Sequence, residues 1–160
     1  MVVTAPFTSA RTPDETARLA ADTMWENDPA CRNLGIEILD VGPGTATLAM
    51  KVVDTMVNGH DTAHGGYIFA LADTAFAYGC NSYGTVTVAA QCSITFIRPG
   101  RRGDRLVASA REVSRQGRNG IYDVTISVDG TVIAEFRGHS RIVGGSFIDG
   151  DVSKVDTPAP

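Results

Sequence analysis

The segment at residues 64–73 holds residue types that carbonyl chemistry needs, at a spacing that fits one helix. Gly65 and Gly66 stand where the chain turns apolar, and two glycines at a helix entrance lower helix propensity and so need a reason. Glycine lets a ligand approach the first N–H groups of a helix, where the positive helix end stabilises a developing oxyanion. A simpler role, turning the chain into the helix, explains the two glycines equally well.

Asp73 is a carboxylate in an otherwise apolar stretch, where burial is costly unless the group is paired, hydrogen-bonded or used. It is a candidate general base or nucleophile on a carbonyl, and the alternative is that it faces solvent or ties down a neighbouring loop. Eight residues of helix span about 12 Å, so Gly65 and Asp73 of one chain cannot easily reach the same carbonyl. If they cooperate, Gly65 of one chain faces Asp73 of another across a two-fold axis, which gives two sites per dimer.

His60 and His64 lie four residues apart and could bind a metal ion together with Asp61. His139 is the one further histidine, and no cysteine lies at ligand spacing, so we expect no metal site. A role in orienting the loop, or in acid–base chemistry, suits these histidines better. The sequence has no G-x-S-x-G nucleophile elbow and no nucleotide-binding glycine motif between a strand and a helix.

The composition favours one globular domain with an acidic balance. The chain has 160 residues, 43% of them hydrophobic, and a net charge of −4, which argues against a protein that coats nucleic acid. The charge is uneven, because residues 98–141 hold nine arginines and five acidic residues, an excess of four positive charges. Within this stretch Arg98, Arg101, Arg102 and Arg105 are candidate contacts for the phosphates of an anionic ligand, although a solvated loop explains each arginine as well.

Cysteine usage and the N-terminal residues bear on the location of the protein. The three cysteines are widely spaced and form no C-x-x-C motif, so we expect a reduced, cytoplasmic protein. The first residues lack the basic and apolar regions of a signal peptide, and no run of about 18 apolar residues occurs. We therefore expect neither export by a cleavable signal nor a membrane span.

The elements that must position these residues follow from periodicity. Thr12 as N-cap, Pro13 and Glu15 predict a helix that runs to residue 24 or 25, and apolar residues at helical spacing predict a second helix over 63–81. Alternating patterns and turn signals predict strands over 34–41, 45–53, 85–97, 105–116, 120–128 and 131–143. We expect an α+β fold in which the sheet curls around the long helix.

The domain limits follow from the same pattern. We expect a single domain over residues 13–145, between a flexible arm at 1–12 and a flexible tail at 146–160. The strand at 85–97 is unusually long for an edge, and pairing with its symmetry mate in a homodimer is a natural way to cover it.

The string NGHDTAHGGYIFALADTAFAYGCNS at residues 58–82 resembles the hotdog-fold acyl-CoA thioesterases, above all the phenylacetyl-CoA thioesterase type. The strand that ends in FIRPG and the later IYDVTISVDGTVIAEFRGHSR belong to the same resemblance, which covers roughly residues 13–143. It implies a sheet wrapped around one helix, dimers that pair into tetramers, and hydrolysis of aryl- or acyl-CoA without a metal or other cofactor.

The same resemblance assigns roles to individual residues. It implies that Asp73 is the catalytic carboxylate and that Gly65 donates its backbone N–H to the thioester carbonyl. It places Asn58 and His64 at positions that line the site, and Thr74 directly after the catalytic acid. The phosphates of CoA give the arginine-rich stretch at 98–118 a role as the binding rim, with Arg98 or Arg101 as the favoured contact.

Two other functions remain open. A hotdog hydratase or dehydratase would use a histidine and an acid on an enoyl or hydroxyacyl thioester, and a non-catalytic module would bind acyl-CoA without needing a buried Asp73. The acyl group is also open. Aromatic residues that could pack a phenyl ring occur along and after the long helix: Tyr67, Phe69, Phe76, Tyr78 and Tyr83.

Overall fold

The computed structural model describes residues 10–149. Most of the arm and tail expected at 1–12 and 146–160 lies outside the described residues. The elements, in chain order, are α1 (Pro13–Glu26), α2 (Pro29–Asn33), β1 (Glu37–Gly42), β2 (Thr45–Lys51), a 3₁₀ turn η1 (Asp54–Met56), α3 (Gly65–Asn81), β3 (Thr85–Phe96), β4 (Arg105–Gln116), β5 (Asn119–Val128) and β6 (Thr131–Ser146).

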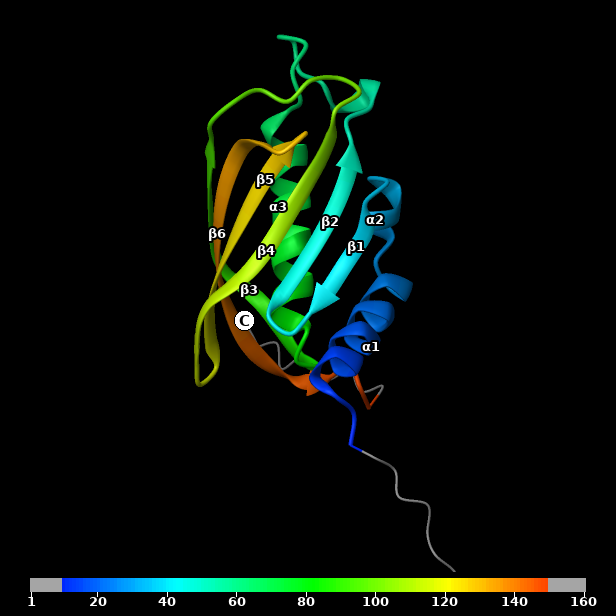
Figure 1. Ribbon diagram of the computed structural model, residues 1–160, viewed down its shortest axis with the longest axis vertical. Coiled ribbons are helices and arrows are strands. Elements are labelled where there is room, and N and C mark those ends of the chain that lie inside the picture. The colour runs from blue at the N-terminus through cyan, green and yellow to red at the C-terminus, as the bar shows by residue number, and fades with distance from the viewer. Residues whose placement is uncertain (1–9, 150–160) are drawn as a thin grey trace, which may run out of the picture.

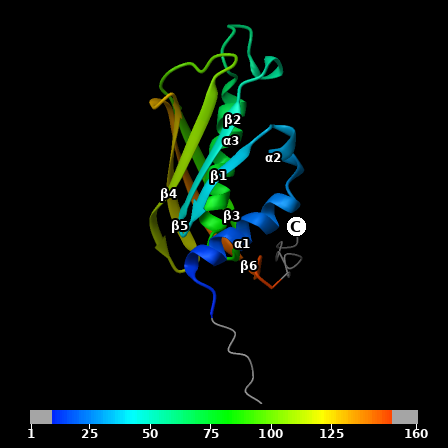
Figure 2. The ribbon, with the colours of Figure 1, turned by 45° about the vertical axis from the view of Figure 1, so that its right-hand side comes forward.

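Six strands form one antiparallel sheet in the order β1-β2-β4-β5-β6-β3. Figures 1 and 2 show the sheet curving around α3, which runs along its concave side, while α1 and α2 lie beside β1. The predicted α+β architecture, a curved sheet of six strands around one long helix with an N-terminal helix, is confirmed. The two edges of the sheet are β1 and β3.

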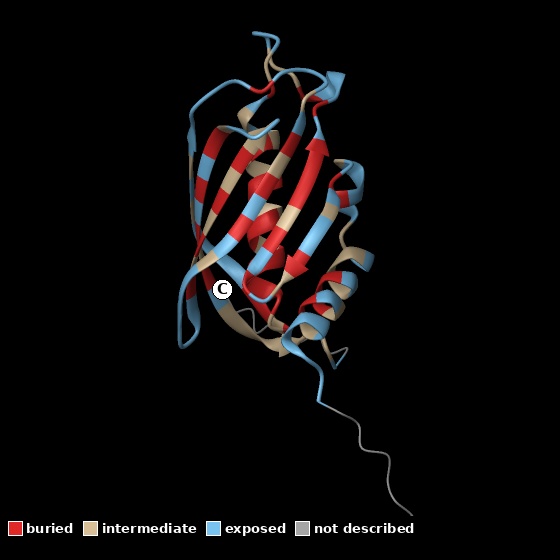
Figure 3. Cartoon of the chain, in the orientation of Figure 1, coloured by how far each residue is buried: buried red, intermediate tan, exposed pale blue. Residues whose placement is uncertain are grey.

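The core lies between α3 and the concave face of the sheet. Inward residues alternate with exposed ones along the strands, as the red bands of Figure 3 show. Small residues let the helix approach the sheet closely: a Cβ at Gly138 would lie 2.8 Å from the Phe76 ring. Leu71, Leu106 and Ile126 are fully buried there, and burying such side chains drives folding. Packing against the sheet and α1 explains why α3 is almost free of charged residues.

Several details differ from the prediction. A short helix, α2, lies between α1 and β1, because Pro29 takes the first helical position after the Asp28 N-cap instead of simply breaking the chain. The first strand accordingly starts at Glu37 and not at residue 34. The long helix begins at Gly65 and not at residue 63, because the Ala63 N–H donates to the carbonyl of Gly100.

Both ends of the described chain are tied to the fold. Thr12 and Glu15 form the predicted capping box of α1. At the other end β6 continues to Ser146, and the N–H of Phe147 donates to the carbonyl of Gly84 at 2.9 Å. The domain limits of 13–145 stay a prediction. No helix within residues 10–149 is long and apolar enough to cross a membrane.

Candidate active site

The N-terminus of α3 presents one backbone donor without a protein acceptor. His64 is the N-cap, and its Nδ1 accepts the N–H of Gly66 at 3.0 Å, while the N–H of Tyr67 donates to the His64 carbonyl. Within the described part of the chain, the N–H of Gly65 donates to no protein acceptor. An unsatisfied N–H at the positive end of a helix suits a developing negative charge on a ligand.

A cavity lies on each side of this helix end. One, of about 470 Å³, is lined by Gly65 and Ile68 of α3 and by the segment 96–99, together with Thr62 and Ala63. The other, of about 500 Å³, is lined by His64, Gly66, Tyr67 and Ala70, together with Leu34, Thr55 and Val57. The two glycines thus line different cavities, and Gly65, whose N–H has no protein acceptor, lines the one beside residues 96–99.

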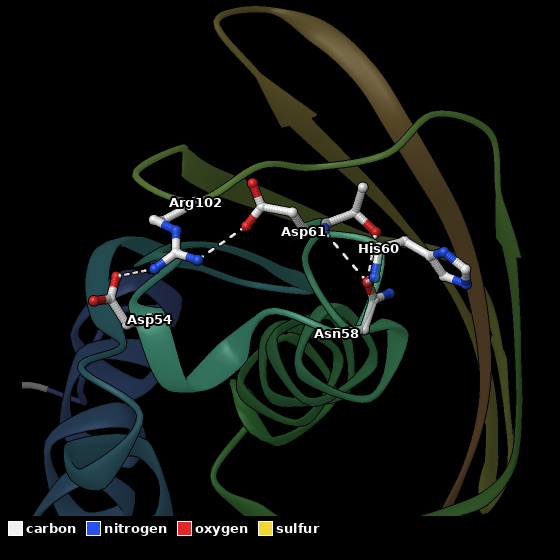
Figure 4. Close-up of polar contacts among 6 residues, drawn as sticks. Asp54, Asn58, His60, Asp61 and Arg102 are labelled. Carbon is white, nitrogen blue, oxygen red and sulfur yellow. Dashed lines mark hydrogen bonds and ion pairs between the residues drawn. The ribbon is translucent and has the colours of Figure 1, made fainter.

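The loop before α3 is ordered by Asn58. Its Oδ1 accepts from the N–H of His60 at 2.9 Å, from the N–H of Thr62 at 3.3 Å and from the Thr62 hydroxyl at 3.2 Å. Figure 4 shows this oxygen inside the loop, with the His60 ring directed away. Asn58 therefore shapes the segment that leads into the helix end.

Arg102 ties the same loop to η1. Its guanidinium lies 2.8 Å from Asp54 Oδ1 and 2.9 Å from Asp61 Oδ1, so that one cation bridges two exposed carboxylates (Figure 4). Asp61 has a φ of 56°, and the loop turns sharply there. Asp61 thus pairs with Arg102, and among residues 10–149 the structure shows no group of three metal-ligand side chains.

Asp73 lies about two turns along α3 from the free N–H and is half-buried. Burial raises the pKa of its carboxyl, and a contact with Cys92 opposes that shift, since Cys92 Sγ lies 3.6 Å from Asp73 Oδ1. Asp73 lines neither of the two cavities at the helix end. The structure therefore places Gly65 and Asp73 on one helix without bringing them to one point within the chain.

The structure directs Thr74 away from these two residues. Its hydroxyl donates to the carbonyl of Ala70 at 2.7 Å and lies 4.0 Å from Cys31 Sγ of α2. The adjacency to Asp73 in sequence thus does not produce a shared site in space, because successive helix residues point in different directions.

The two candidate arginines differ in position. Arg98 lines the cavity beside Gly65, and its Nη1 donates to the carbonyl of Val132 at 2.9 Å. Arg101 lies in the following loop, where its backbone N–H donates to Asp104 Oδ2 and its backbone forms a bridge with Thr62. Both side chains are exposed, so both can meet a ligand that extends out of the cavity.

Comparison with known proteins decides the family. Residues 60–134 match the model of the thioesterase superfamily. The chain is 47% identical over 129 residues to acyl-coenzyme A thioesterase PaaI of Escherichia coli K12, an alignment that covers 79% of this chain and 91% of the relative. The chain belongs to the thioesterase superfamily.

Solved structures of relatives place this thioesterase among hotdog folds. The E. coli PaaI protein of the phenylacetic acid degradation operon superposes with a TM-score of 0.83 at 43% identity, covering 84% of this chain and 99% of that one. A hypothetical thioesterase of Streptococcus pneumoniae TIGR4, solved with coenzyme A, gives a TM-score of 0.67 at 27% identity and covers 69% and 90%. The resemblance stated from the sequence is confirmed, and with it the class of the enzyme, a thioester hydrolase.

Of the aromatic residues considered for an acyl pocket, Tyr67 alone lines a cavity at the helix end of the thioesterase. Phe69 packs edge-on against Phe136, and Phe76 is buried in the core. Tyr78 is also buried, and Tyr83 donates to Glu112. Core packing therefore explains most of this aromatic surface.

Sequence reasoning missed two residues of this region and expected a different contact, with ligand phosphates, for a third. Phe96 lies over Gly65, Cys92 contacts Asp73, and Arg102 bridges two carboxylates. The alternation along residues 85–97 placed Cys92 and Phe96 on the same side of a strand, but only the pairing of β3 with β6 puts that side next to α3. Nothing in the sequence indicates which of four nearby arginines meets Asp54 and Asp61.

Proposed function

We propose that this thioesterase hydrolyses aryl- or acyl-CoA thioesters to the free acid and CoA, with phenylacetyl-CoA or a hydroxylated phenylacetyl-CoA preferred. The observation that carries the proposal is the free N–H of Gly65 beside a cavity, on the helix that also holds the half-buried Asp73. The similarity to PaaI supports the aryl substrate, since that relative belongs to a phenylacetic acid degradation operon.

In this proposal the Gly65 N–H and the positive end of α3 stabilise the oxyanion that forms on the thioester carbonyl. Asp73 takes a proton from water as the water oxygen bonds to the carbonyl carbon, or it attacks the carbon itself and forms an anhydride that water then opens. In both routes the C–S bond breaks and the CoA sulfur leaves as a thiolate that takes up a proton. No metal or other cofactor takes part.

The proposed site is shared between two chains. Gly65 faces Asp73 of the partner subunit in a dimer of antiparallel central helices, because the spacing of about 12 Å keeps the two groups of one chain apart. The edge strand β3 supports such a dimer: along and just after it the large apolar side chains Val88, Phe96 and Ile97 are 40%, 52% and 49% exposed. We propose that these dimers pair into tetramers.

Substrate contacts follow from the two cavities. Arg98 and Arg101 contact the phosphates of CoA, and the coenzyme A complex of the Streptococcus relative supports a CoA site in this fold. Gly66 and His64 line the second cavity, where Tyr67 offers a face for an aryl group. Asn58 acts by holding the loop, and Thr74 acts by packing under α2. We place the enzyme in the cytoplasm, in keeping with its free cysteines.

A thiol-release assay tests the proposal. Wild type and Asp73→Asn are compared on phenylacetyl-CoA, hydroxyphenylacetyl-CoA, benzoyl-CoA, crotonyl-CoA and a medium-chain acyl-CoA. We expect aryl-acetyl thioesters to be the best substrates and the folded variant to lose at least about 10²-fold in kcat. A variant with wild-type activity would show that Asp73 is structural.

Complementation tests the shared site. Gly65→Pro removes the N–H at the first helical position, where proline is tolerated and where the ψ of 131° at His64 suits a following proline. Mixing it with Asp73→Asn and allowing subunit exchange leaves one intact site in each mixed dimer, so activity should return to about a quarter of the wild-type rate. No recovery despite exchange would place both groups in one chain's site.

The same assay separates the two rival functions. Hydration of crotonyl-CoA without release of thiol would favour a hydratase or dehydratase. Recovery of intact acyl-CoA from the protein after hours would favour a binding module.

A further inference from the structure

Cys92 and Asp73 meet across the interface between β3 and α3. Cys92 Sγ lies 3.6 Å from Asp73 Oδ1, within the range of a hydrogen bond to sulfur. Among residues 10–149, Cys92 is the one side chain recorded in a hydrogen bond with Asp73, and no Lys, Arg or His pairs with that carboxylate. Within the described chain, one thiol is therefore the hydrogen-bond partner that directs this half-buried carboxylate.

The thiol can act only as a donor in this contact. Burial and the nearby Asp73 carboxylate raise the pKa of Cys92 to about 11, so the sulfur keeps its proton at neutral pH. A protonated thiol is a weak hydrogen-bond donor, and an ionised carboxylate is an acceptor without a donor of its own. The same protonation makes Cys92 a poor nucleophile, which argues against a covalent role.

We propose that Cys92 is a positioning residue, whose S–H donates to Asp73 Oδ1 and holds the carboxylate in the orientation that hydrolysis needs. The inference rests on the proposed function, because it takes Asp73 as the catalytic carboxylate. The side chain approaches from the strand, so it restricts Asp73 without occupying either cavity at the helix end.

Few other groups act on Asp73. In the described chain, Cys80 of α3 is the other thiol whose pKa the Asp73 carboxylate raises, and burial is the main cause that brings the pKa of Cys80 to about 12, so this thiol is neutral. Over residues 10–149, the other elements packed on α3, namely α1, β1, β2, β4, β5 and β6, bring no cation into an ion pair with Asp73. The hydrogen bond from Cys92 lowers the pKa of Asp73 against the rise that burial causes.

The positioning role is tested by measuring kcat from about pH 5 to about pH 9. The fall of kcat on the acid side of this profile, its acid limb, reports the protonation of Asp73. Cys92→Ala should lower kcat on phenylacetyl-CoA by roughly 5- to 10-fold, leave KM unchanged and move the acid limb to higher pH. Cys92→Ser restores a hydrogen-bond donor and should recover both the wild-type kcat and the wild-type position of the acid limb. The matched control is Cys80→Ala, which removes a buried thiol that bonds only within α3 and should retain the wild-type profile.

The outcomes separate this inference from the proposed function. A wild-type pH profile and kcat in folded Cys92→Ala would overturn the positioning role, as would a Cys92→Ser variant no better than alanine. Asp73→Asn in the same series tests the base itself. If that variant is fully active, the catalytic assignment fails; if it is inactive while Cys92→Ala behaves as wild type, only the inference on Cys92 fails.

Discussion

The Phe96 ring of β3 covers Gly65 at the first turn of α3. A Cβ at residue 65 would lie 2.8 Å from Phe96 Cζ and 3.3 Å from the two adjacent ring atoms. Because real Cβ atoms do not approach so closely, glycine is what lets the strand end and the helix end share one wall of a cavity.

Two substitutions at Gly65 should separate crowding from loss of the donor. Gly65→Ala keeps the N–H but pushes the exposed Phe96 ring aside, and we expect roughly a 10-fold loss in kcat/KM from the displaced substrate. Gly65→Pro also removes the N–H, and we expect at least about 10²-fold loss in kcat. Gly59→Ala is the control, since a Cβ there meets nothing within 4 Å. Equal losses for alanine and proline would show that crowding alone accounts for the effect.

Asp73→Asn should not destabilise the fold at neutral pH. Burial raises the pKa of the native carboxyl above its ordinary 3.8, so the folded state binds a proton more tightly than the unfolded chain. Ionised Asp73 therefore weakens the fold as pH rises from that ordinary value through the native pKa, and asparagine avoids this cost. Urea unfolding measures the free energy of unfolding of both proteins at about pH 4 and pH 7. The value for Asp73→Asn relative to wild type should be higher at pH 7 than at pH 4. A variant that is less stable at pH 7 would indicate a structural role for the carboxylate.

The pH dependence of the reaction should follow the same group. Asp73 must be ionised to act as base or nucleophile, and its raised pKa means that activity is lost on acidification at a higher pH than an exposed aspartate would give. The kcat profile of wild type measures this limb. A rate that stays constant down to the ordinary pKa of aspartate would contradict the effect of burial.

Glu112 should matter for stability and not for chemistry. Its Oε2 accepts the hydroxyls of Tyr83 and Tyr122, each at 2.9 Å, and Arg115 lies 3.4 Å away. Because Tyr122 is buried, Glu112→Ala leaves a hydroxyl without its partner and should cost about 1–3 kcal/mol of unfolding free energy. Glu135→Ala removes an exposed carboxylate with one hydroxyl contact and should change stability by less than about 0.5 kcal/mol. If urea unfolding shows similar losses of unfolding free energy for Glu112→Ala and Glu135→Ala, the special role of Glu112 is disproved.

The sequence predicted the fold well because its patterns are local. The capping box at Thr12 and the helical spacing from Ile68 to Phe76 involve near neighbours, and the structure confirms both elements. The predicted ends of elements were wrong where a contact with a distant residue decides them. The start of α3 is an example, because the N–H of Ala63 donates to the carbonyl of Gly100. Periodicity therefore predicts elements better than their ends.

The candidate site was predictable only in part, for the same reason. Gly65 has a low helix propensity and Asp73 is a carboxylate in an apolar helix. Both residues are therefore unusual at their positions, and this can be seen in the sequence alone. The contacts of Cys92 and Phe96 with α3 depend on where β3 docks, which residue spacing does not encode. Thr74 shows the converse, since its side chain contacts α2 while the side chain of Asp73, the next residue in sequence, contacts β3.

The strand order also dictates when the chain can finish folding. Within residues 10–149, β3 pairs with β6 alone, and β6 is synthesised after the whole of β4 and β5. During synthesis α3 and β3 must wait, with apolar surface uncovered, until residues 131–146 have left the ribosome. A nascent chain that ends before β6 should therefore bind chaperones and remain open to proteases, whereas release of the last strand should close the structure in one cooperative step.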